Sequence, residues 1–142
     1  MKDILTIGLP SKGRLKESAL NFFKKNNLEL ASKGGDRDYF ASLNKLPNTK
    51  VIYLHAREII ERLGDGTLDI GISGLDLLNE STINLQKRIE ILKKLDFGKA
   101  NLVVAVPNDW IDVQTVADLE EVSFHFRDKK NLRLRVATKY PN

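Results

Sequence analysis

Residues 65–78 read DGTLDIGISGLDLL, a strand-like stretch that runs through two glycines into a leucine-rich segment. Apolar residues alternate with aspartate, glycine and serine over residues 68–73, which is the period-2 pattern of a short strand. The leucines after Gly74 predict a helix. A strand that passes through Ser-Gly into a helix leaves backbone N–H groups facing open space, which suits an anion pocket. A buried strand followed by a glycine turn explains the same stretch equally well.

The residues just upstream extend this pattern. Residues 51–54 predict another strand, and residues 57–63 predict an amphipathic helix that Gly64 is placed to end. A strand, a helix and a strand joined by short links predict a parallel pair with a right-handed crossover. We therefore expect the first 80 or so residues to form an α/β unit with a parallel sheet, in which small side chains at Gly71, Ser73 and Gly74 let a ligand approach the backbone.

The amino-terminal segment repeats the order of strand, turn and helix. Residues 4–9 predict a buried strand, and residues 15–23 place apolar side chains on one helical stripe. The turn between them carries Lys12 and Arg14, where a strand's carboxyl end meets a helix amino terminus. Cations there oppose the helix dipole, and a bound anion removes that conflict. A phosphate site is therefore favoured over a chance basic turn.

The second half of the chain predicts fewer elements. Strands are expected at residues 89–95, 101–106 and 132–137, and residues 81–88 are expected to be irregular. Thr115 and Asp118 resemble a capping box at the start of a helix. That helix is expected to bury an apolar stripe of Val116, Leu119, Val122 and Phe126, with His125 as a structural or surface residue beside it.

Composition narrows the class of protein. The 142 residues contain no cysteine, which excludes disulfides and thiolate metal sites. No apolar run reaches the roughly 18 residues of a membrane span, and no signal-peptide pattern precedes the first strand, so a cytoplasmic location is expected. The net charge of +4 fits an anionic small substrate. The basic residues near the end of the chain favour a solvated face over nucleic-acid binding, because no interleaved aromatic residues accompany them.

Five stretches together resemble one enzyme family, ATP phosphoribosyltransferase. In chain order they are PSKGRL (10–15), RDY (37–39), LDIGISGLDLL (68–78), DFGKANLVVAVP (96–107) and ATKYPN (137–142). The similarity spans essentially the whole chain. Residues 108–134 resemble the short-form enzymes, which lack a carboxyl-terminal regulatory domain and often work with a separate subunit that resembles a histidyl-tRNA synthetase.

The resemblance implies a fold and a reaction. The fold is a two-lobed α/β architecture of the periplasmic-binding-protein type (type II), with the active site between the lobes. The reaction joins N1 of the adenine of ATP to C1 of phosphoribosyl pyrophosphate, with release of pyrophosphate, as the first step of histidine biosynthesis. Mg²⁺ accompanies the substrate diphosphate, and a homo-oligomer is expected. We place the first lobe at residues 1–97 and an incomplete second lobe at residues 98–142.

The resemblance also implies roles for individual residues. Lys12, Gly13 and Arg14 match a motif at the substrate phosphates, and Arg37 matches a second arginine that reaches the same region. Arg14 and Arg37 are the expected catalytic residues, which would stabilise charge on the departing pyrophosphate. The substrate-binding residues are completed by Asp69, Gly74, Leu75 and Asp76 at the nucleotide pocket and by Thr138, Lys139 and Tyr140 facing the cleft.

One family feature has no counterpart in these residues. The loop that grips the ribose 5-phosphate, an acidic stretch followed by Thr-Gly-x-Thr-Leu, would lie beyond Asn142. We therefore expect the chain to be a fragment, and to be inactive alone. The alternative function is a non-catalytic module of the same fold that binds a small anion or a nucleotide, because fold alone does not separate the two.

Overall fold

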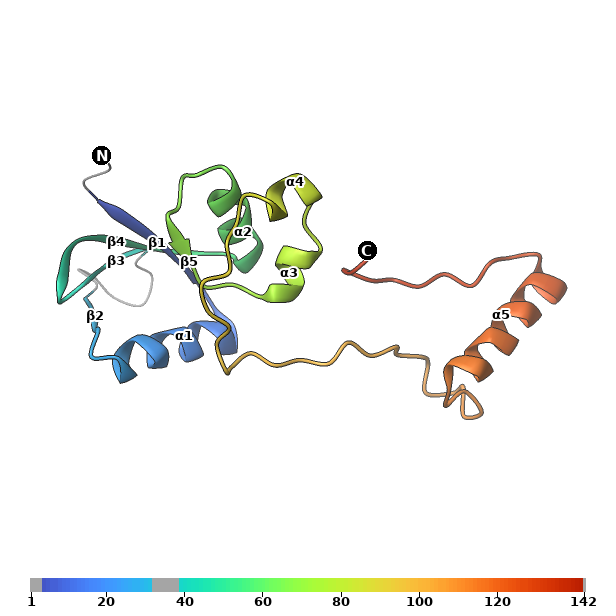
Figure 1. The fold of residues 1–142 in the computed structure, drawn as a ribbon. Helices are drawn as coiled ribbons and strands as arrows, with labels where there is room; N and C mark the ends of the chain where they lie inside the picture. Colours follow the sequence, from blue (N-terminus) through green and yellow to red (C-terminus); the bar gives the residue numbers. More distant parts are fainter. Residues whose placement is uncertain (1–3, 32–38, 142) are drawn as a thin grey trace. The chain divides into compact units, whose positions relative to one another are not determined.

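A computed structural model describes residues 4–31 and 39–141 of the chain. These residues divide into two units, Met1–Lys99 and Ala100–Asn142. Within the described residues, the first unit contains a sheet with helices and the second contains a single helix (Figure 1). The expected α/β class is confirmed, whereas the lobe boundary at residues 97 and 98 stays a prediction.

The first unit is built around a five-stranded sheet. Its strands are β1 (Leu5–Pro10), β2 (Leu30–Ala31), β3 (Phe40–Leu43), β4 (Leu46–Leu54) and β5 (Ile70–Gly71). Their spatial order is β2-β3-β4-β1-β5. Strands β4 and β5 each pair in parallel with β1, whereas β3 pairs antiparallel with both β2 and β4. The sheet is therefore mixed, and the expectation of a wholly parallel sheet is wrong.

The antiparallel part comes from a hairpin that the sequence pattern did not predict. Only Asn44 and Lys45 separate β3 from β4, and so short a link permits only antiparallel pairing. The Asn44 side chain accepts a hydrogen bond from the Glu29 N–H at 3.0 Å, and the Asn44 N–H donates to the Glu29 carbonyl at 3.0 Å. The predicted strand at residues 51–54 is thus the last part of a longer strand.

Strand β5 is shorter than predicted and has a different partner. Of residues 68–73 only Ile70–Gly71 forms a strand, and it pairs with β1 rather than with β4. The extended pairing continues on either side, since the Asp69 N–H donates to the Thr6 carbonyl at 3.1 Å and the Ile72 N–H donates to the Gly8 carbonyl at 3.0 Å. The connection through the intervening helix therefore passes across β1.

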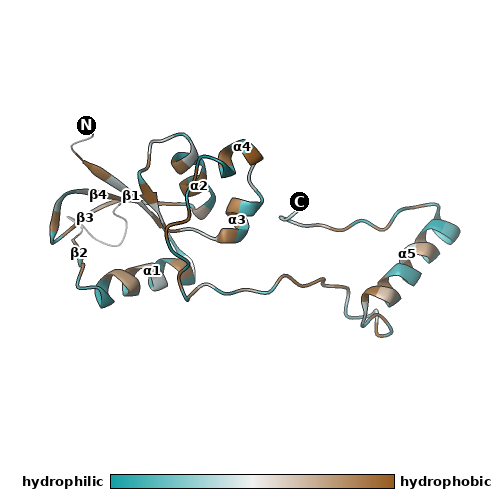
Figure 2. Cartoon of the chain, viewed as in Figure 1, coloured by the Kyte–Doolittle hydropathy of each residue, from teal (hydrophilic) through white to brown (hydrophobic). Residues whose placement is uncertain are grey.

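Helices cover both faces of this sheet. The helices of the first unit are α1 (Gly13–Lys25), α2 (Ala56–Gly64), α3 (Leu75–Asn79) and α4 (Ile83–Gln86). On one face, Ala19 and Phe23 of α1 pack with Ile7, Leu9 and Val51 of the strands. On the other face, Ile59 of α2 packs with Leu54 and Leu68. The two predicted helical stripes are confirmed, and apolar residues mark the strands and helices that meet in these layers (Figure 2).

Helix α4 lies within residues 81–88, which were expected to be irregular. Its Leu85 packs against Gly64 at the end of α2, where an added Cβ would lie 2.7 Å from the Leu85 Cγ atom. The absence of a side chain at Gly64 therefore lets α4 approach α2, and the prediction for residues 81–88 was wrong because this contact orders them.

The second unit contains α5 (Val116–Lys130), which begins at the predicted capping box. The Thr115 hydroxyl accepts a hydrogen bond from the Asp118 N–H at 3.3 Å, and the Asp118 carboxylate accepts one from the Thr115 N–H at 2.7 Å. The helix ends at Asn131, whose φ of 49° places it in the left-handed region. Both ends of the helix therefore follow from local sequence.

The predicted strands at residues 89–95, 101–106 and 132–137 do not form. These residues are described, but the structure pairs none of them in a sheet, and a strand needs a partner for its backbone groups. The predicted burial of the α5 stripe is also wrong, because no described residue of α5 is buried. Val116 is 78% exposed, and Phe126 is only half-buried against Trp110.

Within residues 4–31 and 39–141, no helix has the length and apolar character that crossing a membrane requires.

Candidate functional site

The parallel strands β1, β4 and β5 end at one edge of the sheet. The turns that leave this carboxyl edge lead into α1, α2 and α3, and ligands of open α/β sheets bind at such edges. The Ser11 N–H donates a hydrogen bond to the Leu54 carbonyl at 2.8 Å. The turn that follows β1 is therefore held beside the end of β4.

The turn from β1 into α1 contains the predicted Lys-Gly-Arg motif. Gly13 has a φ of +73°, and an added Cβ there would meet no atom within 4 Å. The glycine is thus needed for the left-handed backbone rather than for space. Lys12 is the N-cap residue in extended conformation, and no side chain caps the helix there. The first N–H groups of α1 consequently lack intrahelical partners.

The charges on this turn all have the same sign. Lys12 and Arg14 are exposed, and no ion pair within the described residues involves either one. The first turn of α1 has no acidic residue, although the positive end of the helix dipole favours one. The structure therefore brings Lys12, Gly13 and Arg14 together in an arrangement suited to a phosphate group.

The turn from β5 into α3 also lies at the carboxyl edge of the sheet. Gly74 is the N-cap residue of α3, and the Asp76 side chain folds back against it so that an added Cβ would clash with the carboxylate. Leu75 is 44% exposed. These three predicted residues therefore lie at the carboxyl edge.

Two neighbouring small residues, Gly71 and Ser73, contact helix α2. The Ser73 hydroxyl donates to the Ala56 carbonyl at 2.7 Å, and Gly71 lies against the side chains of Ile59 and Leu63. Both positions are small because α2 packs closely over β5. The expectation that Gly71 and Ser73 open the backbone to a ligand is therefore corrected.

Asp69 lies at the opposite edge of the sheet. Its carboxylate accepts hydrogen bonds from the Thr6 N–H at 2.8 Å and from the Thr6 hydroxyl at 2.5 Å. Thr6 is near the beginning of β1, and the strand runs on for about 13 Å before it reaches Pro10. The structure therefore does not bring Asp69 to Lys12, Gly13 and Arg14. The sequence could have predicted this position, because Asp69 directly precedes β5 and a residue that precedes a strand lies at the strand's amino end.

The other predicted site residues lie elsewhere. Arg37 is outside the described residues. Thr138, Lys139 and Tyr140 belong to the second unit, where the Tyr140 N–H donates to the Thr138 hydroxyl at 3.0 Å. This bond forms a local turn in place of the predicted strand end.

Residues that the sequence did not single out also lie at the carboxyl edge. His55 directly follows β4 and Arg57 lies in the first turn of α2, and both are exposed. The position of His55 and Arg57 after a strand that runs parallel to β1 is the signal that could have found them. Lys16 of α1 places its Nζ atom 5.1 Å from the centre of the Tyr53 ring, and burial raises the pKa of Tyr53.

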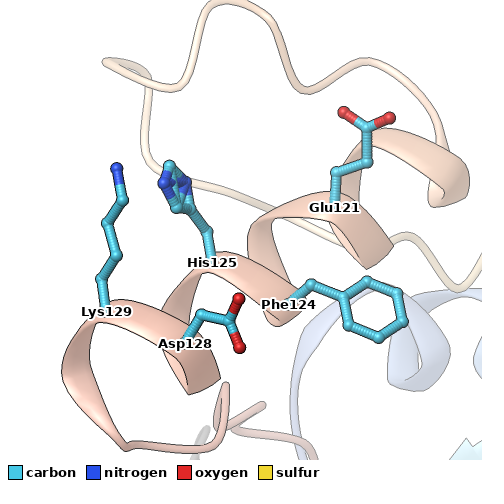
Figure 3. A pocket seen from close by; sticks show the side chains of 5 residues that line it. All are labelled: Glu121, Phe124, His125, Asp128 and Lys129. Carbon is cyan, nitrogen blue, oxygen red and sulfur yellow. The ribbon is translucent and has the colours of Figure 1, made fainter.

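The second unit has an open hollow on α5. It is lined by Glu121, Phe124, His125, Asp128 and Lys129, which all project from the one helix (Figure 3). His125 is exposed, and of the described residues only those of α5 line this hollow. Among the described residues, no group of three or more histidine, aspartate or glutamate side chains could hold a metal ion.

Comparison with known proteins identifies the family. Residues 55–142 match the family of ATP phosphoribosyltransferase. The chain is 47% identical to the ATP phosphoribosyltransferase of Nitrobacter winogradskyi and 46% identical to that of Rhodopseudomonas palustris (strain BisA53), in each case over the whole chain and 44% of the relative. It is 44% identical to the enzyme of Mesorhizobium japonicum over 96% of the chain and 59% of the relative. The chain thus spans less than half the length of the first two relatives. It belongs to the ATP phosphoribosyltransferase family.

Proposed function

We propose that the chain is the amino-terminal portion of the catalytic subunit of an ATP phosphoribosyltransferase. The reaction joins adenine N1 of ATP to C1 of phosphoribosyl pyrophosphate and releases pyrophosphate, as the first step of histidine biosynthesis. The observation that carries this proposal is the turn with Lys12, Gly13 and Arg14, which combines cations with an uncapped helix amino terminus at the carboxyl edge of a parallel β-pair. The family match supplies the substrates.

The chemistry needs alignment and charge neutralisation more than proton transfer. Adenine N1 carries a lone pair, so no base has to remove a proton before attack. The protein has to hold two polyanions together against their repulsion. Negative charge builds on the pyrophosphate as the C1–O bond breaks, and guanidinium groups match phosphate oxygens in pairs. In this proposal Arg14 and Arg37 provide that stabilisation.

We propose that Mg²⁺ binds together with the substrate diphosphate. We assign the ion to the oxygens of the substrate diphosphate, because Mg²⁺ is usually bound through substrate phosphates rather than by an all-protein cluster of ligands. Gly74, Leu75 and Asp76 bind the nucleotide in the proposal, and Thr138, Lys139 and Tyr140 are proposed as further substrate-binding residues. Asp69 is left out because its carboxylate binds Thr6 at the other edge.

The proposal also covers the wider architecture and the partners. The family resemblance supports a two-lobed fold of the periplasmic-binding-protein type II, a homo-oligomer, a regulatory subunit that resembles a histidyl-tRNA synthetase, and a cytoplasmic location. The 142 residues alone are proposed to lack turnover, because none of them matches the family's loop for the ribose 5-phosphate. The alternative function, a non-catalytic module for a small anion or a nucleotide, is favoured by one observation. The anion-binding turn lies entirely within the first unit, on a packed core.

Calorimetric titration of the 142-residue chain tests the proposed pyrophosphate site. Pyrophosphate, the leaving group that Arg14 is proposed to stabilise, should bind more tightly than orthophosphate, and Arg14→Gln should weaken pyrophosphate binding about tenfold, since a hydrogen bond to a charged group is worth roughly 1.5–3 kcal/mol. Lys25→Gln is the matched control, because it removes one positive charge from the last turn of the same helix. Equal pyrophosphate affinity in wild type and Arg14→Gln would refute the site.

A further inference from the structure

Phe97 and Gly98 belong to the stretch DFGKANLVVAVP, which resembles the family but has no part in the proposed site. Both residues lie in the first unit, against α1. The centre of the Phe97 ring is 6.4 Å from that of the Phe22 ring, and the two rings are tilted by 55°. An added Cβ at Gly98 would lie 3.3 Å from the Leu15 Cδ1 atom. Since Leu15 and Phe22 lie on one stripe of the helix, residues 97 and 98 pack along that stripe.

The first turn of α1 lacks the local features that order the start of a helix. Within the described residues, no side chain caps the helix at Lys12, and the first turn contains no acidic residue. Lys12 and Arg14 place positive charge at the positive end of the helix dipole, which disfavours the turn. Helix α5 differs, because a complete capping box at Thr115 and Asp118 stabilises its start. The order of the first turn of α1 therefore depends on packing against residues distant in the sequence.

Contacts from distant segments do reach this first turn. Lys16 places its Nζ atom 5.1 Å from the centre of the Tyr53 ring of β4. Leu15 is contacted by Gly98, whose φ of +74° lies in the left-handed region that glycine adopts without strain. The packing of Phe97 on the helix keeps this segment in place. Residues 97 and 98 thus support the side of the turn that directly follows Arg14.

We propose that Phe97 and Gly98 are positioning residues, whose packing on α1 orders the turn that contains Lys12 and Arg14. This inference rests on the proposed function, which assigns that turn to the departing pyrophosphate. Neither Phe97 nor Gly98 touches the ligand. Loss of their contact lets the first turn unwind, and only the molecules with an ordered turn bind. The apparent affinity for pyrophosphate then falls in proportion to the ordered fraction.

NMR spectroscopy and calorimetry of the 142-residue chain test this inference. Cα chemical shifts of residues 14–17 report the helical population of the first turn of α1, and those of residues 22–25 report the last turn. Phe97→Ala should lower the first-turn population about threefold and weaken pyrophosphate binding by the same factor. The last turn should stay helical, because Phe23 is buried in the core. Phe97→Leu, which keeps a large apolar side chain, should restore both the population and the affinity.

Gly98→Ala tests the second contact. The new methyl group would press on Leu15, and the left-handed backbone would be strained. Gly66→Ala is the matched control, because Gly66 has a φ of +81° but an added Cβ there would meet no atom within 4 Å. Gly98→Ala should lower the first-turn population and the pyrophosphate affinity, and Gly66→Ala should leave both unchanged. Leu92→Ala, which removes an apolar side chain that is 75% exposed, is the control for Phe97→Ala.

The outcomes separate this inference from the proposed function. Loss of helix and of affinity in the same proportion, with recovery of both in Phe97→Leu, would support the inference. Unchanged first-turn shifts in Phe97→Ala and Gly98→Ala would overturn it, as would a loss of helix with unchanged pyrophosphate affinity. In either of these cases the proposed function stands if Arg14→Gln loses affinity. A wild-type chain that does not bind pyrophosphate saturably would reject the proposed site and the positioning role together.

Discussion

Gly8 and Gly71 are register partners on adjacent parallel strands, and the side chain of Ile59 packs against both of them. An added Cβ at Gly71 would lie 2.5 Å from the Ile59 Cγ2 atom and 3.0 Å from the Leu63 Cδ1 atom. An added Cβ at Gly8 would lie 2.6 Å from the Leu68 Cδ1 atom. Ile59 is fully buried. The pair of glycines therefore sets how closely α2 approaches the sheet and, with it, where the β4–α2 turn lies.

Gly71→Ala should lower the free energy of unfolding by about 1–3 kcal/mol, because overpacking forces Ile59 or the strand to move. Urea denaturation of wild type and variant measures the change. A double-mutant cycle with Ile59→Ala provides the control, since removing the Ile59 side chain makes room for the new methyl group. The double mutant should lose less than the sum of the two single losses. Strict additivity would contradict the proposed contact.

Asp69→Asn should affect stability and leave ligand binding alone. The carboxylate accepts two hydrogen bonds from Thr6 and joins the beginning of β1 to the beginning of β5. Its loss should lower the free energy of unfolding by about 1 kcal/mol, with ATP affinity within about twofold of the wild type. Thermal denaturation and calorimetry measure the two quantities. Unchanged stability with a tenfold loss of ATP affinity would return Asp69 to the nucleotide pocket.

The capping box of α5 predicts a pH dependence. Hydrogen bonds from the Thr115 hydroxyl and from the Gln114 and Thr115 N–H groups lower the pKa of Asp118 below its ordinary value of 3.8. A lowered pKa in the folded state means that the stabilisation is present above pH 3.8 and is lost as the pH falls through the lower folded value. NMR titration of the Asp118 carboxyl carbon should show this, and Thr115→Val should move the pKa towards 3.8. A wild-type pKa at or above 3.8 would rule out the cap.

The elements that were predicted correctly are those that depend on residues close to one another in the sequence. The helical stripe at Ala19 and Phe23 and the capping box at Thr115 and Asp118 depend on residues within a few positions of one another, and both are confirmed. The hairpin of β3 and β4 and the pairing of β5 with β1 depend on contacts between distant residues. Periodicity carries no information about such partners, so both were missed.

The candidate site shows the same division. The position of Lys12, Gly13 and Arg14 between a strand and a helix could be predicted, because these elements follow one another in the sequence, and their role in binding stays a prediction. The place of Arg57 at the same edge of the sheet could not be predicted, because it depends on β4 lying beside β1. Asp69 was assigned to the wrong end of the sheet. The motif match located Asp69 in the sequence, but it did not indicate at which end of the strands this residue lies.

The most direct test is the activity of a chimera in which this chain replaces the matching 142 residues of the Nitrobacter winogradskyi relative. Formation of N1-(5-phosphoribosyl)-ATP from ATP, phosphoribosyl pyrophosphate and Mg²⁺ is followed by absorbance. The account predicts turnover by the chimera and a loss of about a hundredfold in kcat for Arg14→Gln, since one preorganised donor to the leaving group contributes on the order of 3 kcal/mol. Lys25→Gln should retain the activity of the chimera. A folded chimera that binds ATP but forms no product, or an Arg14→Gln chimera with unchanged kcat, would contradict the account.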